Sequence, residues 1–224
     1  MMAAWITRVP VRLNTFTGLV FPSATGLKQK LLIFTDRLTS ACATHIIPEG
    51  EGVKNDLINY KITKKPLRVL GYGNMRGIDL EYYDPDIPEV RTQADKIRDK
   101  GTFTFVFVGR LVKDKGINEL VKAFLQLHIK YPDTRLLLVG PYENDLDPLE
   151  PETLAEIRNN KAIKSAGSQT DVRPWLAASD VFVFPSYREG FPNVVIEAGA
   201  MGLPSIVTDI NGSREIIING ENGT

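Results

Sequence analysis

The sequence contains few of the residues that build disulfides and metal sites. It has one cysteine, Cys42, so no intrachain disulfide can form, which fits a reducing compartment. The two histidines, His45 and His128, lie far apart and lack metal-ligand spacing, so structural roles are expected for both. Asp84-Pro85-Asp86 has the spacing of some metal motifs but lies among turn-forming residues and is interpreted as a turn. No metal site is predicted.

The sequence also lacks an excess of charge and a long apolar run. Lys and Arg number 27, as do Asp and Glu, so the formal net charge is zero and a nucleic-acid partner is not expected. No run approaches the roughly 20 apolar residues that span a bilayer. The N-terminal stretch is broken by Arg8, Pro10 and Arg12 and does not resemble a signal peptide. The chain is predicted to be cytoplasmic, and a local basic patch that contacts the membrane as a peripheral partner stays open.

The second half of the 224-residue chain alternates between two patterns. Short apolar β-rich runs at residues 102–109, 135–140, 181–185 and 204–209 predict strands. Helical spacing is found at residues 115–132, 151–160, 194–201 and 213–219. This alternation predicts an α/β fold with a parallel sheet covered on both faces. Right-handed crossovers then put the carboxyl ends of the strands, and any ligand, along one edge.

The first half is less regular. Residues 28–48 predict a helix followed by a short strand, residues 54–62 a helix, and residues 67–71 a strand. Glycines and prolines from residue 71 to 88 indicate a linker, and a charged helix is expected just after it. The predicted domains are 1–72, a partial N-terminal domain on the acceptor side, and 101–224, joined by a linker at 73–100. Counting elements predicts a chain cut at both ends, with the second domain incomplete at its end.

A basic strand-to-helix turn is the first candidate site. Gly109 and Arg110 follow one predicted strand, and Lys115 precedes its helix. Free backbone N–H groups and the helix dipole make such a turn suitable for a phosphate, and the two cations add charge. The alternative is an ordinary solvated basic turn.

A second candidate is the pair Glu189 and Glu197, which flanks a loop that runs into a helix. Two carboxylates that converge on a cleft can accept hydrogen bonds from sugar hydroxyls, and a helix N-terminus between them can meet a diphosphate. The spacing alone is weak, because two surface glutamates in ion pairs would give the same pattern. Glu197 is expected about two helical turns beyond Glu189.

Two further patterns have simpler explanations. Gly71, Gly73 and Gly77 follow a predicted strand and approach a dinucleotide-binding fingerprint, but no helix is predicted to open there. A nicotinamide oxidoreductase therefore stays a minor alternative. Asp171 and Trp175 flank a predicted helix start, with the aspartate as cap and the tryptophan packed.

The motifs VGRLVKDKGINELVKAF and DVRPWLAASDVFVFPSYREGFPNVVIEAGAMGLPSIVTDINGSREII together resemble the C-terminal domain of glycosyltransferase family 4. That family has the GT-B fold, with two Rossmann-like domains. The resemblance covers about residues 100–224. Parts of residues 15–83 resemble the end of the N-terminal domain in bacterial members that build cell-surface polysaccharides. The family's Gly-rich loop and acceptor contacts, early in its N-terminal domain, have no counterpart here.

The resemblance implies roles for individual residues. Arg110 and Lys115 match the basic pair that neutralises the donor diphosphate, Glu189 the carboxylate that contacts the donor sugar, and Glu197 the one that binds the ribose. The remaining donor-binding positions are Gly109, Gly167 and Ser168 (the last two near the nucleobase), Gly190, Phe191, Pro192, Asn193 and Val194. Arg110, Lys115 and Glu189 are the expected catalytic residues.

The implied activity is retaining transfer of a sugar from a nucleotide sugar, with UDP as the expected nucleotide, to a polysaccharide or lipid-linked saccharide acceptor. No metal or other cofactor is implied. A non-catalytic nucleotide-sugar-binding fragment is the alternative.

Overall fold

The computed structural model describes residues 1–143 and 145–224, which divide into two compact units. The first unit comprises Met1–Gly77 together with two later segments, Arg188–Pro192 and Asp209–Glu215. The second comprises Ile78–Tyr187, Asn193–Thr208 and Ile216–Thr224. The predicted linker 73–100 is therefore divided at Gly77, and its larger part belongs to the second unit.

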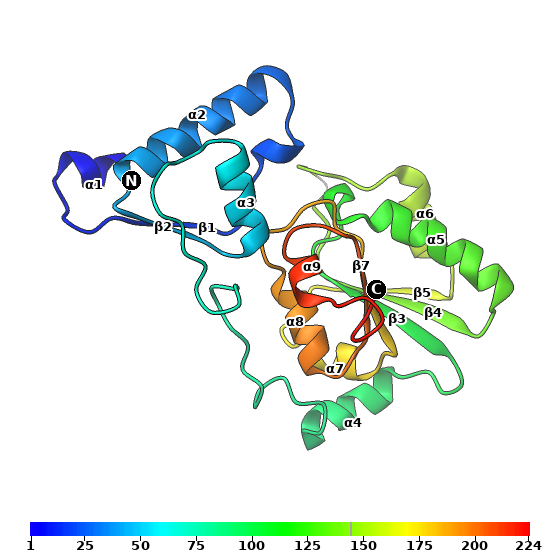
Figure 1. The fold of residues 1–224 in the computed structure, drawn as a ribbon. Coiled ribbons are helices and arrows are strands. Elements are labelled where there is room, and N and C mark those ends of the chain that lie inside the picture. Colours follow the sequence, from blue (N-terminus) through cyan, green and yellow to red (C-terminus); the bar gives the residue numbers. More distant parts are fainter. Residues whose placement is uncertain (144) are drawn as a thin grey trace. The chain divides into compact units, whose positions relative to one another are not determined.

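A five-stranded parallel sheet forms the centre of the second unit (Figure 1). Its strands are β3 (Phe103–Val108), β4 (Thr134–Val139), β5 (Ile163–Gly167), β6 (Val181–Phe184) and β7 (Ser205–Val207). Their order across the sheet is β5-β4-β3-β6-β7, and every neighbouring pair is parallel. The predicted α/β fold with a parallel sheet is confirmed. The strand β5 was not predicted, because polar residues interrupt its short sequence, IKSAG.

Except for α4, which precedes β3, the helices of this unit follow the strands in sequence. They are α4 (Pro88–Ile97), α5 (Ile117–Lys130), α6 (Pro151–Asn159), α7 (Arg173–Ala177), α8 (Asn193–Ala200) and the short 3₁₀ turn η2 (Lys113–Lys115). The helix α5 buries Ile117, Val121 and Phe124 at helical spacing, as the sequence predicts. The helix α4 lies where a charged helix was expected, and one of its faces buries Val90 and Ala94.

The core of the second unit lies around the sheet. Val106, Phe107, Leu136, Leu138 and Phe182 have no exposed side-chain surface or almost none. Parallel strands buried on both faces read as continuous apolar runs, and this burial explains why residues 102–109 and 135–140 are recognisable as strands from sequence alone.

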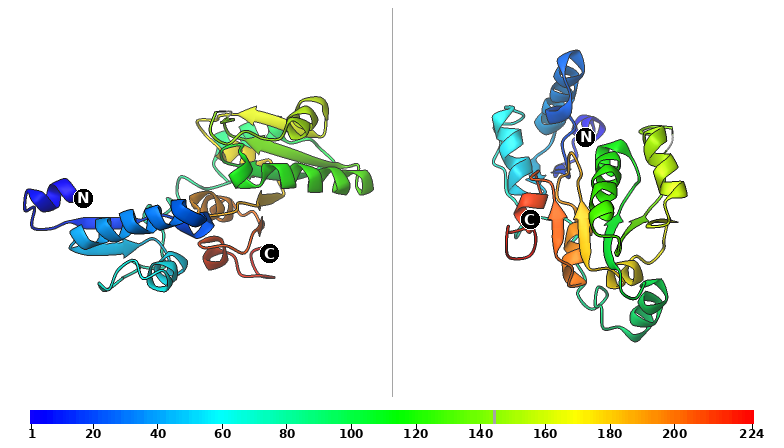
Figure 2. Two further views of the ribbon diagram at one scale, coloured as in Figure 1. Left: turned by 90° about the horizontal axis from the view of Figure 1, so that it is seen from above. Right: turned by 90° about the vertical axis from the view of Figure 1, so that its right-hand side faces the viewer.

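The first unit has a smaller sheet. The strands β1 (Leu13–Phe16) and β2 (His45–Pro48) pair in parallel, and α2 (Gly26–Cys42) runs alongside them (Figure 1 and the left view of Figure 2). The remaining elements are α1 (Met2–Ile6), η1 (Phe21–Ser23), α3 (Glu51–Asn59) and α9 (Ser213–Ile216), which begins in this unit. A second apolar core contains Phe16, Phe21, Ile46, Val53 and Leu57.

The prediction of a strand at residues 67–71 is wrong. Only Leu67 forms a bridge, to Ile46, and the chain then enters turns. Arg68, Leu70 and Gly71 are exposed, so the pairing does not continue beyond Leu67. The helix predicted from residue 213 is also short, and ends at Ile216.

Candidate functional site

The topological switch point of the large sheet lies between β3 and β6. From β3 the chain adds β4 and β5 on one side, and from β6 it adds β7 on the other. Crevices form at such points, beyond the carboxyl ends of the strands, because the connecting loops diverge. The loop Gly109–Gly116 follows β3, and Pro185 follows β6. The predicted basic turn therefore lies at the position where this fold type binds ligands.

Arg110 is held in an ion pair on this edge. Its Nη1 atom donates to the Oε2 of Glu143 at 2.7 Å, and about half of the Arg110 side chain is exposed. Glu143 follows β4, the next strand along the sheet. Glu143 was not predicted from sequence, although its position just beyond a predicted strand end was visible. An incoming anion has to compete with this carboxylate for the guanidinium.

Lys115 lies beside the end of β6. Its Nζ atom is 5.4 Å from the centre of the ring of Phe184, the last residue of β6. The next residue, Gly116, has φ +71°, and a Cβ there would lie 2.1 Å from the carbonyl oxygen of Pro185. Only glycine allows this approach, so α5 begins directly beside the end of β6. The positive end of a 14-residue helix thus lies at the switch point.

Gly167 and Ser168 lie at the same edge of the sheet, at the end of β5. The carbonyl of Gly167 accepts the N–H of Gly140, the residue after β4, at 2.9 Å. Gly167 has φ +66° and open space where a Cβ would stand. The loop is therefore placed two strands away from the switch point, and its proposed contact with a nucleobase stays a prediction.

Three predicted residues lie on α8 in the second unit. Asn193 begins the helix, Val194 is half-buried, and Glu197 is 8% exposed. Glu197 lies little more than one turn into α8, not two helical turns beyond Glu189, because Glu189–Pro192 is not helical. The loop delays the helix start, and the Glu-x7-Glu spacing alone does not reveal this.

The loop that carries Glu189, Gly190, Phe191 and Pro192 belongs to the first unit. A Cβ on Gly190 would lie 2.0 Å from the carbonyl oxygen of Thr17 and 2.7 Å from Oε2 of Glu49. The ring of Phe191 lies against Gly50 and Gly73, and Phe191 is 8% exposed. The loop therefore packs directly on the backbone of the first unit, and a side chain at position 190 would push it away.

Glu49, a buried carboxylate next to this loop, was not predicted from sequence. It directly follows β2 and is 7% exposed. Burial, with the nearby charge of Glu189 as a smaller cause, raises the pKa of Glu49, while hydrogen bonds from the backbone N–H groups of Met75 and Phe191 oppose the rise.

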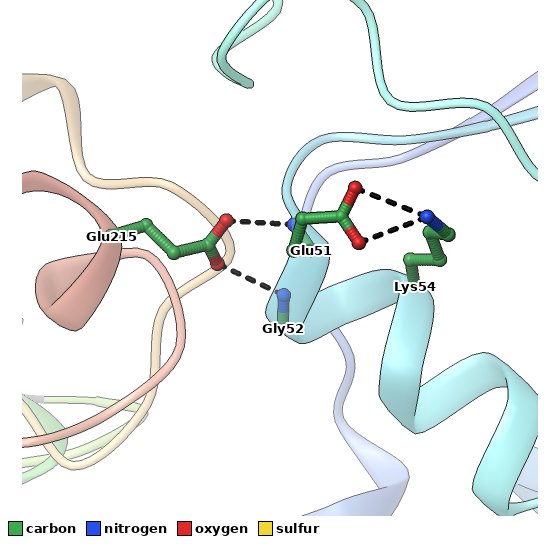
Figure 3. Close-up of polar contacts among 4 residues, drawn as sticks. All are labelled: Glu51, Gly52, Lys54 and Glu215. Carbon is green, nitrogen blue, oxygen red and sulfur yellow. Dashed lines mark hydrogen bonds and ion pairs between the residues drawn. The ribbon is translucent and has the colours of Figure 1, made fainter.

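A clasp formed by residues 209–215 holds the other side of the loop. The carboxylate of Glu215 accepts the backbone N–H groups of Glu51 at 2.7 Å and Gly52 at 2.9 Å (Figure 3). The side-chain amide of Asn211 donates to the carboxylate of Asp56 at 2.7 Å, and Asp56 lies on α3 together with Glu51 and Gly52. Gly212, with φ +74°, approaches so closely that a Cβ there would lie 2.5 Å from the carbonyl oxygen of Gly190. The clasp thus connects α3 with the loop.

The remaining candidates have structural explanations. His128 contacts Thr134 at 3.1 Å and stacks on Phe124. No helix opens between Gly77 and α4, so the dinucleotide fingerprint lacks its helix. The predicted Asp171 cap is wrong, because α7 has Val172 at its N-cap and no side-chain cap. The carboxylate of Asp171, one residue earlier, accepts the N–H of Arg173 at 3.0 Å, and Trp175 packs against the core as predicted. Within residues 1–143 and 145–224, no three His, Cys, Asp or Glu side chains gather to hold a metal ion.

Comparison with known proteins identifies the fold. The crystal structure of Anabaena Alr3699/HepE in complex with UDP and glucose matches with a TM-score of 0.79 at 20% identity, and covers 99% of this chain and 59% of that chain. The architecture is the Rossmann-like α/β fold of GT-B glycosyltransferases.

Sequence comparison identifies the family. The family described as "Glycosyl transferases group 1" matches residues 102–224, and the chain belongs to it. The capsular polysaccharide biosynthesis glycosyltransferase CapM of Staphylococcus aureus is 35% identical over 99% of this chain and 58% of its own length. The UDP-Gal:alpha-D-GlcNAc-diphosphoundecaprenol alpha-1,3-galactosyltransferase of Escherichia coli is 29% identical over 99% of this chain and 57% of its own length. The chain thus spans just over half the length of these relatives.

Proposed function

We propose that the chain provides the donor-binding part of a retaining glycosyltransferase of family 4. Its reaction transfers a sugar from a UDP-sugar to a polysaccharide or lipid-linked saccharide acceptor. The observation that carries this proposal is the position of Arg110 and Lys115 beside the switch point between β3 and β6. Support for the nucleotide and the acceptor comes from the names of the relatives and from the UDP complex of the structural neighbour.

The chemistry is electrostatic. When the bond between the sugar and the diphosphate breaks, negative charge grows on the leaving phosphate oxygen. Cations and helix N–H groups that are already in place stabilise that charge without reorganisation. We assign this stabilisation of the leaving phosphate to Arg110, Lys115 and the N-terminus of α5, without a cofactor or metal ion. The sugar is held for attack from the same face, so the anomeric configuration is retained.

A thermal-shift panel tests the donor. UDP and at least one UDP-sugar are expected to raise the melting temperature, because a ligand that binds only the folded state stabilises it. ADP, GDP and NAD(P) serve as comparisons. Stabilisation by none of the nucleotides contradicts the proposal, and stabilisation by NAD(P) alone favours an oxidoreductase. A transfer and hydrolysis assay with the best donor follows, in which binding without turnover supports a non-catalytic nucleotide-sugar-binding fragment.

A peripheral contact with the cytoplasmic face of an anionic membrane is proposed for the first unit. Residues Met1–Gly77 contain 11 Lys and Arg against four Asp and Glu. On α2, the exposed apolar side chains Leu27, Leu31 and Phe34 recur at helical spacing on one face. Basic residues near an anionic surface and an apolar helix face favour adsorption. Within the described residues, no helix is long and apolar enough to cross a membrane.

Co-sedimentation with vesicles tests this contact. Phosphatidylglycerol vesicles are expected to bind the chain more strongly than phosphatidylcholine vesicles, and F34E is expected to weaken this binding. L146E, at an exposed leucine of the second unit, is the matched control. Equal binding to both kinds of vesicle, or to neither, contradicts the contact.

A further inference from the structure

Glu49 connects three segments of the first unit through its backbone. Its N–H donates to the carbonyl of Phe16 at the end of β1 at 3.0 Å. Its own carbonyl accepts the N–H of Asn74 at 2.8 Å. The residue therefore lies at a fixed place between the end of the small sheet and the turn around residue 74.

The Glu49 side chain is directed at the loop that carries Glu189. Its carboxylate accepts the backbone N–H groups of Met75 and Phe191. Its Oε2 would lie 2.7 Å from a Cβ on Gly190, so the carboxylate fills the space beside that residue. Two consecutive residues of the loop are thus fixed against one side chain.

The charge at this position is costly. Glu49 is 7% exposed and has the carboxylate of Glu189 as an electrostatic neighbour. Burying a carboxylate close to another one opposes folding, and two backbone N–H groups offset this cost only in part. An uncharged side chain would serve packing alone at lower cost. The carboxylate is therefore better explained by a role in holding the loop than by a contribution to stability.

We propose that Glu49 is a positioning residue of the donor-sugar site, which holds the backbone of Gly190 and Phe191 so that Glu189 presents its carboxylate to the sugar. The inference rests on the proposed function, because it assigns Glu189 to the donor sugar. Glu49 acts through the loop and touches no reacting atom. A loop displaced by a fraction of an ångström would misplace the Glu189 carboxylate relative to the sugar.

Two variants and a control separate positioning from simple folding. Glu49→Gln keeps the size and one acceptor oxygen, whereas Glu49→Ala removes both acceptors. Glu51→Gln is the matched control, because its exposed carboxylate pairs with Lys54 and lies only two residues away. The probes are UDP, UDP-glucose and UDP-galactose, with affinity measured by calorimetry and turnover measured for the better donor.

Glu49→Ala is expected to lower turnover about tenfold or more, and Glu49→Gln is expected to show a smaller loss. UDP affinity is expected to stay within about twofold of wild type in both, while the gain in affinity that the sugar adds is reduced. Glu51→Gln is expected to match wild type. If Glu49→Gln and Glu49→Ala both keep wild-type turnover and wild-type affinity for the UDP-sugars, this inference alone is overturned. Equal losses for UDP and UDP-sugars, together with a lower melting temperature, show a structural role and also overturn it. A wild type that binds no probe overturns the proposed function, and this inference with it.

Discussion

The carboxylate of Glu215 accepts the backbone N–H of Gly52 at 2.9 Å, although 163 residues separate them in sequence (Figure 3). The helix α3 has a glycine, Gly50, at its N-cap and no capping side chain of its own. Glu215 takes that place from a distant part of the chain and also meets the positive end of the helix dipole. The side chain of Glu51 pairs with Lys54, and the backbone N–H of Glu51 donates to Glu215.

We predict that Glu215→Ala lowers the free energy of unfolding by about 2 kcal/mol, because it removes a charged cap that receives two N–H groups. Urea denaturation followed by circular dichroism measures the change. Glu156→Ala, at an exposed position of α6, is the control and is expected to change stability by less than about 0.5 kcal/mol. If Glu215→Ala lowers the free energy of unfolding no more than this control does, the clasp does not stabilise the fold.

Arg110→Ala or Lys115→Ala is expected to lower turnover of a UDP-sugar at least about tenfold, on the order of 1.4 kcal/mol in the activation free energy. Each variant removes a cation that is placed to stabilise the leaving diphosphate. Initial rates with saturating donor measure the effect. Lys113→Ala, an exposed lysine of the same turn, is the control and is expected to keep the wild-type rate. Unchanged rates in both site variants exclude the catalytic role.

Much of the second unit is predictable from sequence because its strands are buried on both faces. Residues such as Val106 and Leu138 come from apolar runs that end at a glycine, and these runs identify β3 and β4. The short strand β5 contains a lysine and a serine and has no such run. The predicted strand at residues 67–71 had the apolar pattern but forms only one bridge, at Leu67.

The candidate site was predictable where it is local in sequence. Arg110 and Lys115 belong to one strand-to-helix turn, so the pattern itself places them at the sheet edge. Glu49, Glu143 and Glu215 act through partners that the fold supplies from far along the chain. No spacing in a single sequence indicates such pairings, since they depend on how the backbone of one segment packs against another.

The ion pair between Arg110 and Glu143 predicts a gain of affinity on mutation. Phosphate oxygens and the Glu143 carboxylate compete for the same guanidinium, and an exposed pair of this kind contributes at most about 1 kcal/mol. Glu143→Gln is therefore expected to tighten UDP binding by about two- to fivefold at low salt, measured by calorimetry. The gain is expected to shrink at high ionic strength. The double variant with Arg110→Ala should show no gain, and a gain that persists there would assign the effect to another group.

The raised pKa of Glu49 predicts a pH-dependent stability with a defined sign. Its folded-state pKa lies above the ordinary value of 4.5, so the folded chain holds this proton more tightly than the unfolded chain. The contribution of Glu49 to stability is therefore full below pH 4.5 and is lost as the pH rises through the folded-state pKa. Glu49→Gln does not titrate and keeps its contribution throughout. The melting temperature of wild type minus that of Glu49→Gln is thus expected to fall between pH 4 and pH 7.

Thermal melts of the two proteins in matched buffers of constant ionic strength measure this difference. Glu51→Gln again provides the control for the loss of a nearby carboxylate, because its exposed carboxylate pairs with Lys54. A difference for Glu49→Gln that stays constant or rises with pH would mean that the Glu49 carboxylate is well solvated or firmly paired in the folded state. The cost that argues for a positioning role would then be absent.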